Sequence, residues 1–161
     1  MKKIVLSNRA MAAMVSGIEK FPEKENGGPL LGRVRKDGID IIEALEAGEH
    51  AVHEKGRLSC DTESVEYMAS TVNGLYEEKL EWIGIWHKHN HDQNPPFSEE
   101  DNQCHRALCD LKKRDVISIL FQKTEEEEYV MRVFRYSTDH RLTEEDFEIK
   151  DLNKMISYRT W

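Results

Sequence analysis

Three histidines stand within five residues, directly after an apolar run. In a strand, alternate side chains point to the same face about 7 Å apart, so His87 and His89 can reach one ion. Ser98 is a typical helix N-cap, and Asp101 would project from the first helical turn back towards the strand end. Two neutral imidazoles and one carboxylate form a three-ligand set that leaves the fourth position on zinc for water. The pattern therefore predicts a catalytic zinc site rather than a structural one.

At these residues the sequence resembles the JAMM (JAB/MPN-plus) zinc metalloproteases, of the prokaryotic stand-alone type. The family motif joins a glutamate to a downstream His-x-His, seven residues and Ser-x-x-Asp, and Ser98-Glu99-Glu100-Asp101 matches its last part without a gap. Counted from His89, eight residues precede Ser98; counted from His91, six do. We prefer His87, His89 and Asp101 as the zinc ligands, because the apolar strand leads directly into the first pair. The pair His89 and His91 stays open as an alternative, and RadC-type relatives of the family also carry a His-Asn-His segment.

Glu25 stands before Asn26-Gly27-Gly28-Pro29-Leu30-Leu31-Gly32, which is similar to the family's Glu-x-Gly-Gly-x-Leu-x-Gly. The resemblance implies that Glu25 is the catalytic acid and base, and that the Ser98 hydroxyl steadies the oxyanion. Physically, the glycines let the chain turn tightly into a strand, and a carboxylate before that turn can lean over the sheet end. The simpler interpretations are a solvated loop glutamate and a serine that only caps its helix.

Hydrophobic periodicity predicts the element order β-α-β-β-α-β-α-β-β. We expect helices after Ser7, Asp61 and Ser98, strands over 29–34, 39–45, 80–86, 116–122 and 129–136, and an irregular loop over 47–60. This order gives an α/β (α+β) sandwich in which helices flank one mixed sheet. The resemblance implies a cytidine-deaminase-like JAB/MPN domain. We expect a single domain over 1–161, with a core over 1–136 and a C-terminal extension that holds an edge strand at 147–149 and a short helix at 152–158.

The remaining histidines and the cysteines are expected to have structural roles. His50, His53 and His140 lack ligand spacing and are expected on the surface. His105 forms an i, i+4 pair with Asp101 that could itself bind a metal, which is a weaker alternative. The third helix is expected to bury a stripe made of Cys104, Ala107, Leu108 and Leu111. Cys60, Cys104 and Cys109 form neither a paired framework nor a Cys-x-x-Cys motif, so packing in a reducing cytosol is expected rather than nucleophilic catalysis.

Composition limits the classes of partner. The chain has 161 residues, of which 39% are hydrophobic and 34% charged, and no apolar run approaches the length of a membrane helix. Its first residues, 1–6, are too short an apolar segment for a signal peptide and are expected to form the first strand. A cytoplasmic location is expected from the unpaired cysteines. The formal net charge is −8, which argues against nucleic acid and favours a basic protein surface as partner. For the same reason, the letters His89-Asn90-His91 are not taken as a nuclease motif.

The resemblance implies a zinc-dependent isopeptidase or peptidase. By that resemblance it hydrolyses the bond after the C-terminal tail of ubiquitin or a ubiquitin-like protein, with Zn²⁺ as cofactor and such conjugates as partners. Two other classes stay open. One is a catalytically inactive MPN-type scaffold, and the other is a zinc hydrolase acting on a small molecule. A deaminase-like enzyme would favour a Cys-x-x-Cys ligand pair, which this sequence lacks.

Overall fold

A computed structural model describes residues 2–54, 56–90 and 95–160 of the protein. The helices are α1 (Asn8–Lys20), α2 (Thr62–Asn73), α3 (Glu99–Lys112) and the short 3₁₀ helix η1 (Leu152–Lys154). The strands are β1 (Lys3–Ser7), β2 (Asn26–Val34), β3 (Gly38–Ala44), β4 (Val52–Glu54), β5 (Arg57–Ser59), β6 (Glu81–His89), β7 (Val116–Lys123), β8 (Tyr129–Tyr136), β9 (Leu142–Glu144) and β10 (Phe147–Lys150).

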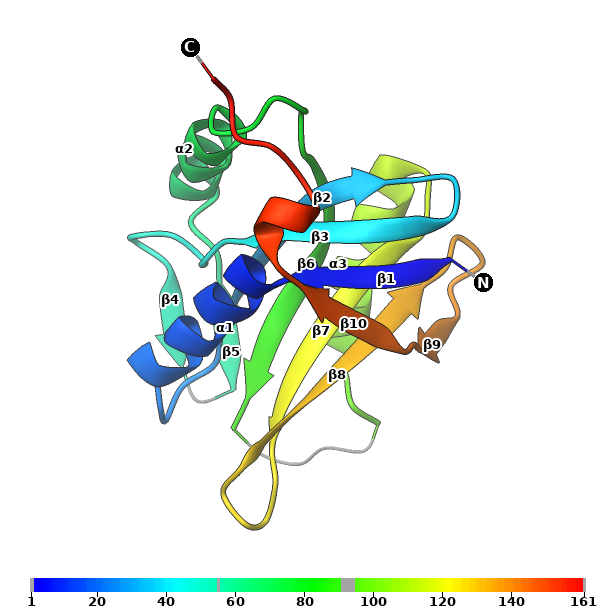
Figure 1. Cartoon of the computed structure of the whole chain (residues 1–161). Coiled ribbons are helices and arrows are strands. Elements are labelled where there is room, and N and C mark those ends of the chain that lie inside the picture. The colour runs from blue at the N-terminus through cyan, green and yellow to red at the C-terminus, as the bar shows by residue number, and fades with distance from the viewer. Residues whose placement is uncertain (1, 55, 91–94, 161) are drawn as a thin grey trace.

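Eight of these strands form one curled sheet in the order β10-β1-β3-β2-β6-β7-β8-β9 (Figure 1). The pairs β1–β10, β1–β3 and β6–β7 are parallel, and the other pairs are antiparallel. Figure 1 shows α1 in front of the sheet and α3 behind it. The protein therefore has a mixed α+β fold in which helices flank one mixed sheet, as the sequence predicts.

Helix α1 covers the front face of the sheet with one stripe of buried residues. The Ser7 hydroxyl accepts a hydrogen bond from the Ala10 backbone N–H at 2.9 Å and so caps the helix. The buried residues of the helix are Ala10, Met14, Gly17 and Ile18. A Cβ atom at Gly17 would lie 2.7 Å from the Trp86 ring. Gly17 therefore lets α1 approach β6 closely, and β6 is the strand that carries the candidate histidines.

Helix α3 covers the opposite face, but with a different stripe from the predicted one. Its buried residues are His105, Leu108 and Cys109, while Cys104 is exposed and Leu111 is 68% exposed. The side chain of Asp101 faces the end of β6, and His105 and Leu108 follow it on the same helical face at i+4 and i+7. The buried face is therefore turned by one residue from the expected stripe.

Two further segments correct the sequence-based predictions. The stretch 47–60 is not an irregular loop throughout, because β4 and β5 pair antiparallel within it. The stretch 152–158 contains a three-residue 3₁₀ helix instead of a longer helix. The predicted edge strand is present as β10, which pairs in parallel with β1. In the described part of the chain, no helix has the length and apolarity needed to cross a membrane.

Candidate metal centre

Strand β6 places His87 and His89 on the face of the sheet that α3 covers. Their ring centroids are 6.0 Å apart, and the His89 side chain is only 2% exposed. Trp86 and Lys88 alternate with them and point to the α1 face. The spacing in the sequence therefore has the predicted structural consequence: two imidazoles lie side by side at the end of one strand.

Asp101 reaches the same place from the first turn of α3. The Ser98 hydroxyl accepts a hydrogen bond from the Asp101 N–H at 3.1 Å, and an Asp101 carboxylate oxygen accepts one from the Ser98 N–H at 2.9 Å. This reciprocal capping box holds the carboxylate at the helix start. One Asp101 oxygen lies 3.8 Å from His87 Nε2, and the other lies 3.5 Å from His89 Nε2.

These distances are suited to a shared cation. Two ligands bound tetrahedrally to one zinc at about 2.0–2.1 Å lie roughly 3.3–3.4 Å from each other. The two observed N···O separations are longer than that by a few tenths of an ångström and are too long for good hydrogen bonds. Among the described residues, no group of three His, Cys, Asp or Glu side chains stands fully arranged around a metal position. The donor chemistry fits zinc, and the two imidazole–carboxylate distances approach the spacing that zinc needs.

The protonation states of two of these donors suit a cation as well. Burial lowers the pKa of His87 against the opposing charge of Asp101, so the imidazole is neutral, which is the form that binds metals. Burial alone would raise the pKa of Asp101. The charge that His87 carries when protonated and the hydrogen bond from the Ser98 N–H outweigh burial, and the pKa of Asp101 lies below its ordinary value. Asp101 is therefore a carboxylate at neutral pH.

Glu25 enters the site from the start of β2. Asn26 pairs with Lys88 and Gly27 with His87 across the antiparallel β2–β6 ladder, so Glu25 is the next position, beside His89. Burial, followed by the charges of Asp101 and Glu100, raises the pKa of Glu25 to about 7. The candidate base is thus close enough to Asp101 to respond to its charge, and it can both take and return a proton near neutral pH.

Strand β4 holds the backbone of Glu25 in place. The Glu25 N–H donates to the Glu54 carbonyl at 2.9 Å, and the Glu25 carbonyl lies 3.0 Å from His53 Nδ1, which donates to it when protonated. The His53 ring also stacks on Phe21 at 3.7 Å. The expectation that His53 is an ordinary surface histidine is therefore wrong: the side chain is half-buried and supports the candidate base. No local spacing in the sequence signals this contact.

Lys88 was not singled out by the sequence, although it lies between the two candidate ligands. Its side chain is 0% exposed. The ammonium donates hydrogen bonds to the carbonyl oxygens of Phe21 and Lys24, the latter at 2.9 Å, and lies 5.7 Å from the centre of the Tyr129 ring. Burial lowers the pKa of Lys88. Lys88 thus ties the segment that ends at Glu25 to the strand that carries the histidines.

The sequence leaves two alternative ligand sets open, one that uses His105 with Asp101 and one that uses His89 with His91. His105 is fully buried below the site, with its Nε2 2.8 Å from the Ser118 hydroxyl and its ring 6.2 Å from that of His87. Burial lowers the pKa of His105 to about 3. It packs behind His87 and is hydrogen-bonded to β7. His91 lies outside the described residues, so the alternative pair of His89 and His91 stays a prediction.

Comparison with known proteins gives a relationship of fold. No protein-family model matches the chain, and no curated protein matches it. The structure is similar to the solution structure of protein DSY2949 from Desulfitobacterium hafniense, with a TM-score of 0.60 and 17% sequence identity. The similarity covers 92% of this chain and 93% of that one. At this identity the likeness concerns the fold alone, and it extends over nearly the whole length of both proteins.

Proposed function

We propose that this protein is a zinc-dependent isopeptidase or peptidase of the JAMM type, on a cytidine-deaminase-like JAB/MPN fold. One observation carries the proposal: His87, His89 and Asp101, with Glu25 and Ser98 beside them, come together from three separate segments of the chain. The carboxylate oxygens of Asp101 lie 3.5–3.8 Å from the imidazole nitrogens of both histidines. Glu25 follows the backbone register of β2 to the same strand end. The resemblance to the JAMM motif assigns metal binding to His87, His89 and Asp101, proton transfer to Glu25 and oxyanion stabilisation to Ser98.

His87, His89 and Asp101 would hold the ion. When bound, zinc would supply a polarised water that is a nucleophile near neutral pH. Glu25 would accept the proton of this water and return it to the leaving amine, which its pKa of about 7 favours. The Ser98 oxygen already accepts the capping bond from Asp101, and its O–H proton is left to donate to an oxyanion.

The proposed substrate is the C-terminal tail of ubiquitin or a ubiquitin-like protein, in a conjugate or precursor. Such a tail is extended and could add as a strand to a sheet edge. The β4–β5 sheet has only two strands and lies against Glu25 through the Glu54 carbonyl. Because β4 meets Glu25 on its outer side, the outer edge of β5 is our candidate for pairing with the tail.

Metal content and cleavage test the proposal together. We expect about one zinc per chain in protein purified without chelator, and cleavage of a ubiquitin-like fusion or isopeptide conjugate. His87→Ala should abolish zinc binding, while His91→Ala should retain most of it. The reverse result would move the site to His89 and His91. Protein that takes up no zinc even when the ion is added would instead be an MPN-type scaffold. Zinc binding without peptide cleavage would favour a small-molecule hydrolase.

A further inference from the structure

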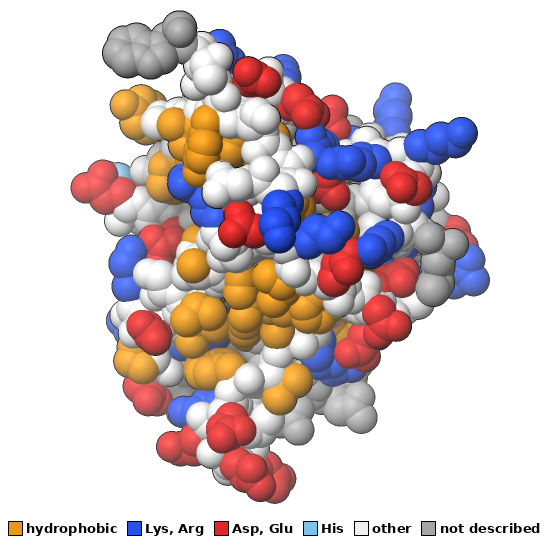
Figure 2. Space-filling model, viewed as in Figure 1, with side chains coloured by type: hydrophobic (Ala, Val, Ile, Leu, Met, Phe, Trp, Pro, Cys, Tyr) orange, Lys and Arg blue, Asp and Glu red, His pale blue; other side chains and the backbone are white. Residues whose placement is uncertain are grey.

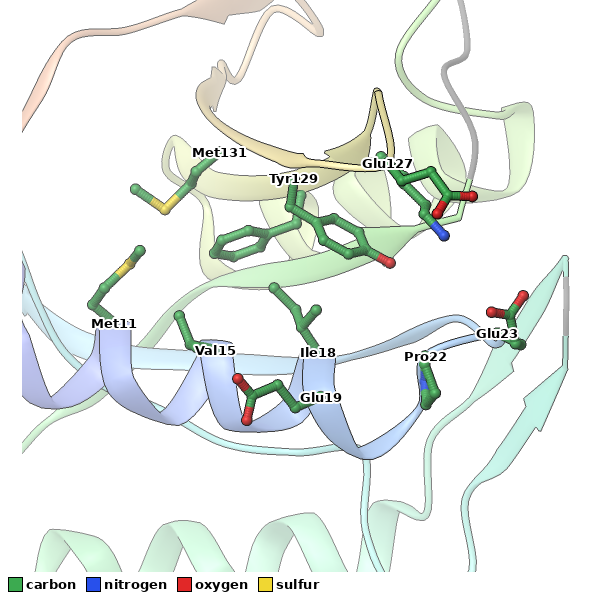
Figure 3. A pocket seen from close by; sticks show the side chains of 11 residues that line it. Met11, Val15, Ile18, Glu19, Pro22, Glu23, Glu127, Tyr129 and Met131 are labelled. Atoms are coloured by element: carbon green, nitrogen blue, oxygen red, sulfur yellow. The ribbon is translucent and has the colours of Figure 1, made fainter. Parts of the chain in front are cut away.

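A second surface, on the face of the sheet opposite His87 and His89, has the features of a docking groove. It lies between α1 and the β7–β8 hairpin and has a volume of about 570 Å³ (Figure 3). Its apolar lining residues are Met11, Val15, Ile18, Pro22, Phe121, Tyr129 and Met131. In Figure 2 apolar side chains gather on this face between α1 and β8, above the acidic tip of the β7–β8 hairpin.

The sequence of α1 explains why the groove is open. Met14 turns into the core and Ile18 is buried beside the groove, whereas Met11 and Val15 lie further round the helix and face β8 across the groove. Val15 is 38% exposed, although it stands on a helix that is otherwise anchored by its apolar stripe. Two methionines flank the groove, and flexible thioether side chains adapt to different apolar partners.

The charged side chains at the groove are predominantly acidic. Glu19, Glu23 and Glu127 line it, and Lys123 is the one basic residue among its lining residues. Within residues 2–54, 56–90 and 95–160, these three glutamates form no ion pair. Asp40, by contrast, is paired with Arg33 at 2.9 Å on another part of the surface. The groove therefore carries more negative than positive charge beside its apolar area, with three glutamates against Lys123 in its lining and the buried Lys88 ammonium near Glu23. The net charge of −8 opposes docking of a second copy of this chain.

We propose that this groove docks a segment of a partner protein that presents apolar side chains flanked by lysine or arginine. The apolar side chains would insert between α1 and β8, beside Met11 and Met131. The basic flank would lie towards Glu23 and Glu127, which Figure 3 shows at the same end of the groove. Charge complementarity of this kind selects partners and accelerates their encounter. The inference needs neither zinc nor peptidase activity.

Short fluorescent peptides can test the groove directly. The probe has a central Leu-Leu-Phe with lysine flanks, and it is matched by one peptide with glutamate flanks and another with a central Ser-Ser-Ser. We expect saturable binding of the first peptide only, and weaker binding as salt is raised. In protein with ¹³C-labelled methionine methyl groups, the signals of Met11 and Met131 should shift. The signal of Met155, which packs in a different apolar cluster, should stay unchanged.

Substitutions locate the contact. Val15→Asp should weaken binding of the lysine-flanked peptide by roughly 10-fold or more, because it places a charge in the apolar floor. Tyr67→Asp is the matched control, since Tyr67 is 75% exposed on α2 and lies outside the groove. Equal binding of both charged peptides would overturn the proposal, as would no binding up to about 1 mM. Concentration-dependent shifts of Met11 and Met131 without peptide would overturn it in favour of a second copy. All these results are independent of metal content and cleavage.

Discussion

At the scale of single residues, the candidate site separates two carboxylates by their surroundings. The pKa of Asp101 is lowered by the charge that His87 carries when protonated and by hydrogen bonds at a helix start, so Asp101 is a carboxylate at neutral pH. Glu25 is driven towards the protonated form by burial and by the negative charges of Asp101 and Glu100. Pairs of titratable groups whose pKa values are pushed apart are typical of acid–base sites. The two side chains therefore suit different tasks, ion binding and proton transfer.

This difference leads to the first prediction. Glu25→Gln preserves the size of the side chain but removes its ability to accept a proton. Zinc content and folding should stay near wild type, while cleavage of a ubiquitin-like fusion should fall by roughly 100-fold or more. Asp101→Asn should weaken zinc retention as well as cleavage. Metal analysis, thermal unfolding and gel-based cleavage on the same preparations separate the two effects. Wild-type cleavage by Glu25→Gln would mean that Glu25 is only a loop residue.

Glu25 should also make the stability of the zinc-free protein depend on pH. The pKa of its carboxyl is raised in the folded state from an ordinary 4.5 to about 7. The folded state then binds more protons than the unfolded state between these values, so the free energy of unfolding falls as pH rises from about 4.5 to about 7. Above about pH 7 the free-energy cost of burying the Glu25 carboxylate is fully present, and Glu25→Gln removes this cost.

Urea unfolding with a chelator present measures this effect. At about pH 8, we expect Glu25→Gln to be more stable than wild type by on the order of 1 kcal/mol, after allowing for solvent screening of a half-buried group. The difference should shrink towards about pH 4.5, where both side chains are neutral. Glu54→Gln, at an exposed position of β4, serves as control. A difference that does not change with pH would show that the Glu25 carboxyl is not buried as described.

The sequence predicts the candidate ligands and the helix cap, but it does not predict the residues that support them. His87, His89, Ser98 and Asp101 follow local rules, namely the alternation of a strand and the chemistry of a helix cap. Lys88 acts through contacts with backbone carbonyls that are 64 or more positions away, and His53 acts in the same way across 28 positions. A carbonyl group carries no sequence signal, so such supports become visible only when the fold is known.

At the scale of elements, β6 works on both of its faces. Its odd-numbered residues His87 and His89 face α3, while Trp86 and Lys88 face α1. Trp86 meets Gly17 of α1 and donates a hydrogen bond to the Leu45 carbonyl at 2.7 Å. Lys88 bonds to the turn after α1. One strand therefore sets the position of the candidate metal ligands and of the segment that carries the candidate base.

The third prediction concerns the buried ammonium of Lys88. Lys88→Met keeps the length and much of the volume of the side chain but removes two hydrogen bonds from a buried ammonium to backbone carbonyls. We expect a loss of roughly 1–3 kcal/mol in the free energy of unfolding. Because the turn before Glu25 is released, we also expect kcat to fall while zinc content stays near one per chain. Urea unfolding, metal analysis and steady-state cleavage are the measurements.

Lys79 is exposed and lies shortly before β6 in the chain, so Lys79→Met controls for the loss of a positive charge. A variant that loses stability but keeps wild-type kcat would show that Lys88 only supports the fold. A variant that loses zinc would show that the histidines themselves have moved. Either result would contradict the role of Lys88 in positioning Glu25.

At the scale of the whole molecule, local sequence patterns predict the fold class, but they do not predict how distant strands pair in the sheet. The apolar, β-branched and aromatic runs of β7 and β8, and the helical periodicity of α1, predict elements whose bounds in the structure lie within a few residues. The parallel pairing of β1 with β10 joins residues about 140 positions apart. The β4–β5 pair has three residues in each strand, too few for alternation to be distinguished from a loop. The long-range register and the three-residue strands β4 and β5 could therefore not be predicted from the sequence.

The arrangement of the site leads to the last prediction, because its parts come from elements that are distant in the chain. His87 and His89 belong to β6, and Asp101 to α3. An ion held by all three joins these elements only in the folded state. A ligand that binds only the folded state stabilises it by about 2.7 kcal/mol when its free concentration is 100-fold above its dissociation constant. For a chain of this size, we expect Tm to rise by roughly 5–10 °C in such a zinc buffer and to fall again on chelation.

His140→Ala, at an exposed histidine, should keep the full zinc-dependent rise in Tm, whereas His87→Ala should lose it. Calorimetry of the three proteins with and without zinc measures the shift. If wild type and His87→Ala respond equally, the stabilising ion binds elsewhere on the surface, and β6 and α3 are not joined through it.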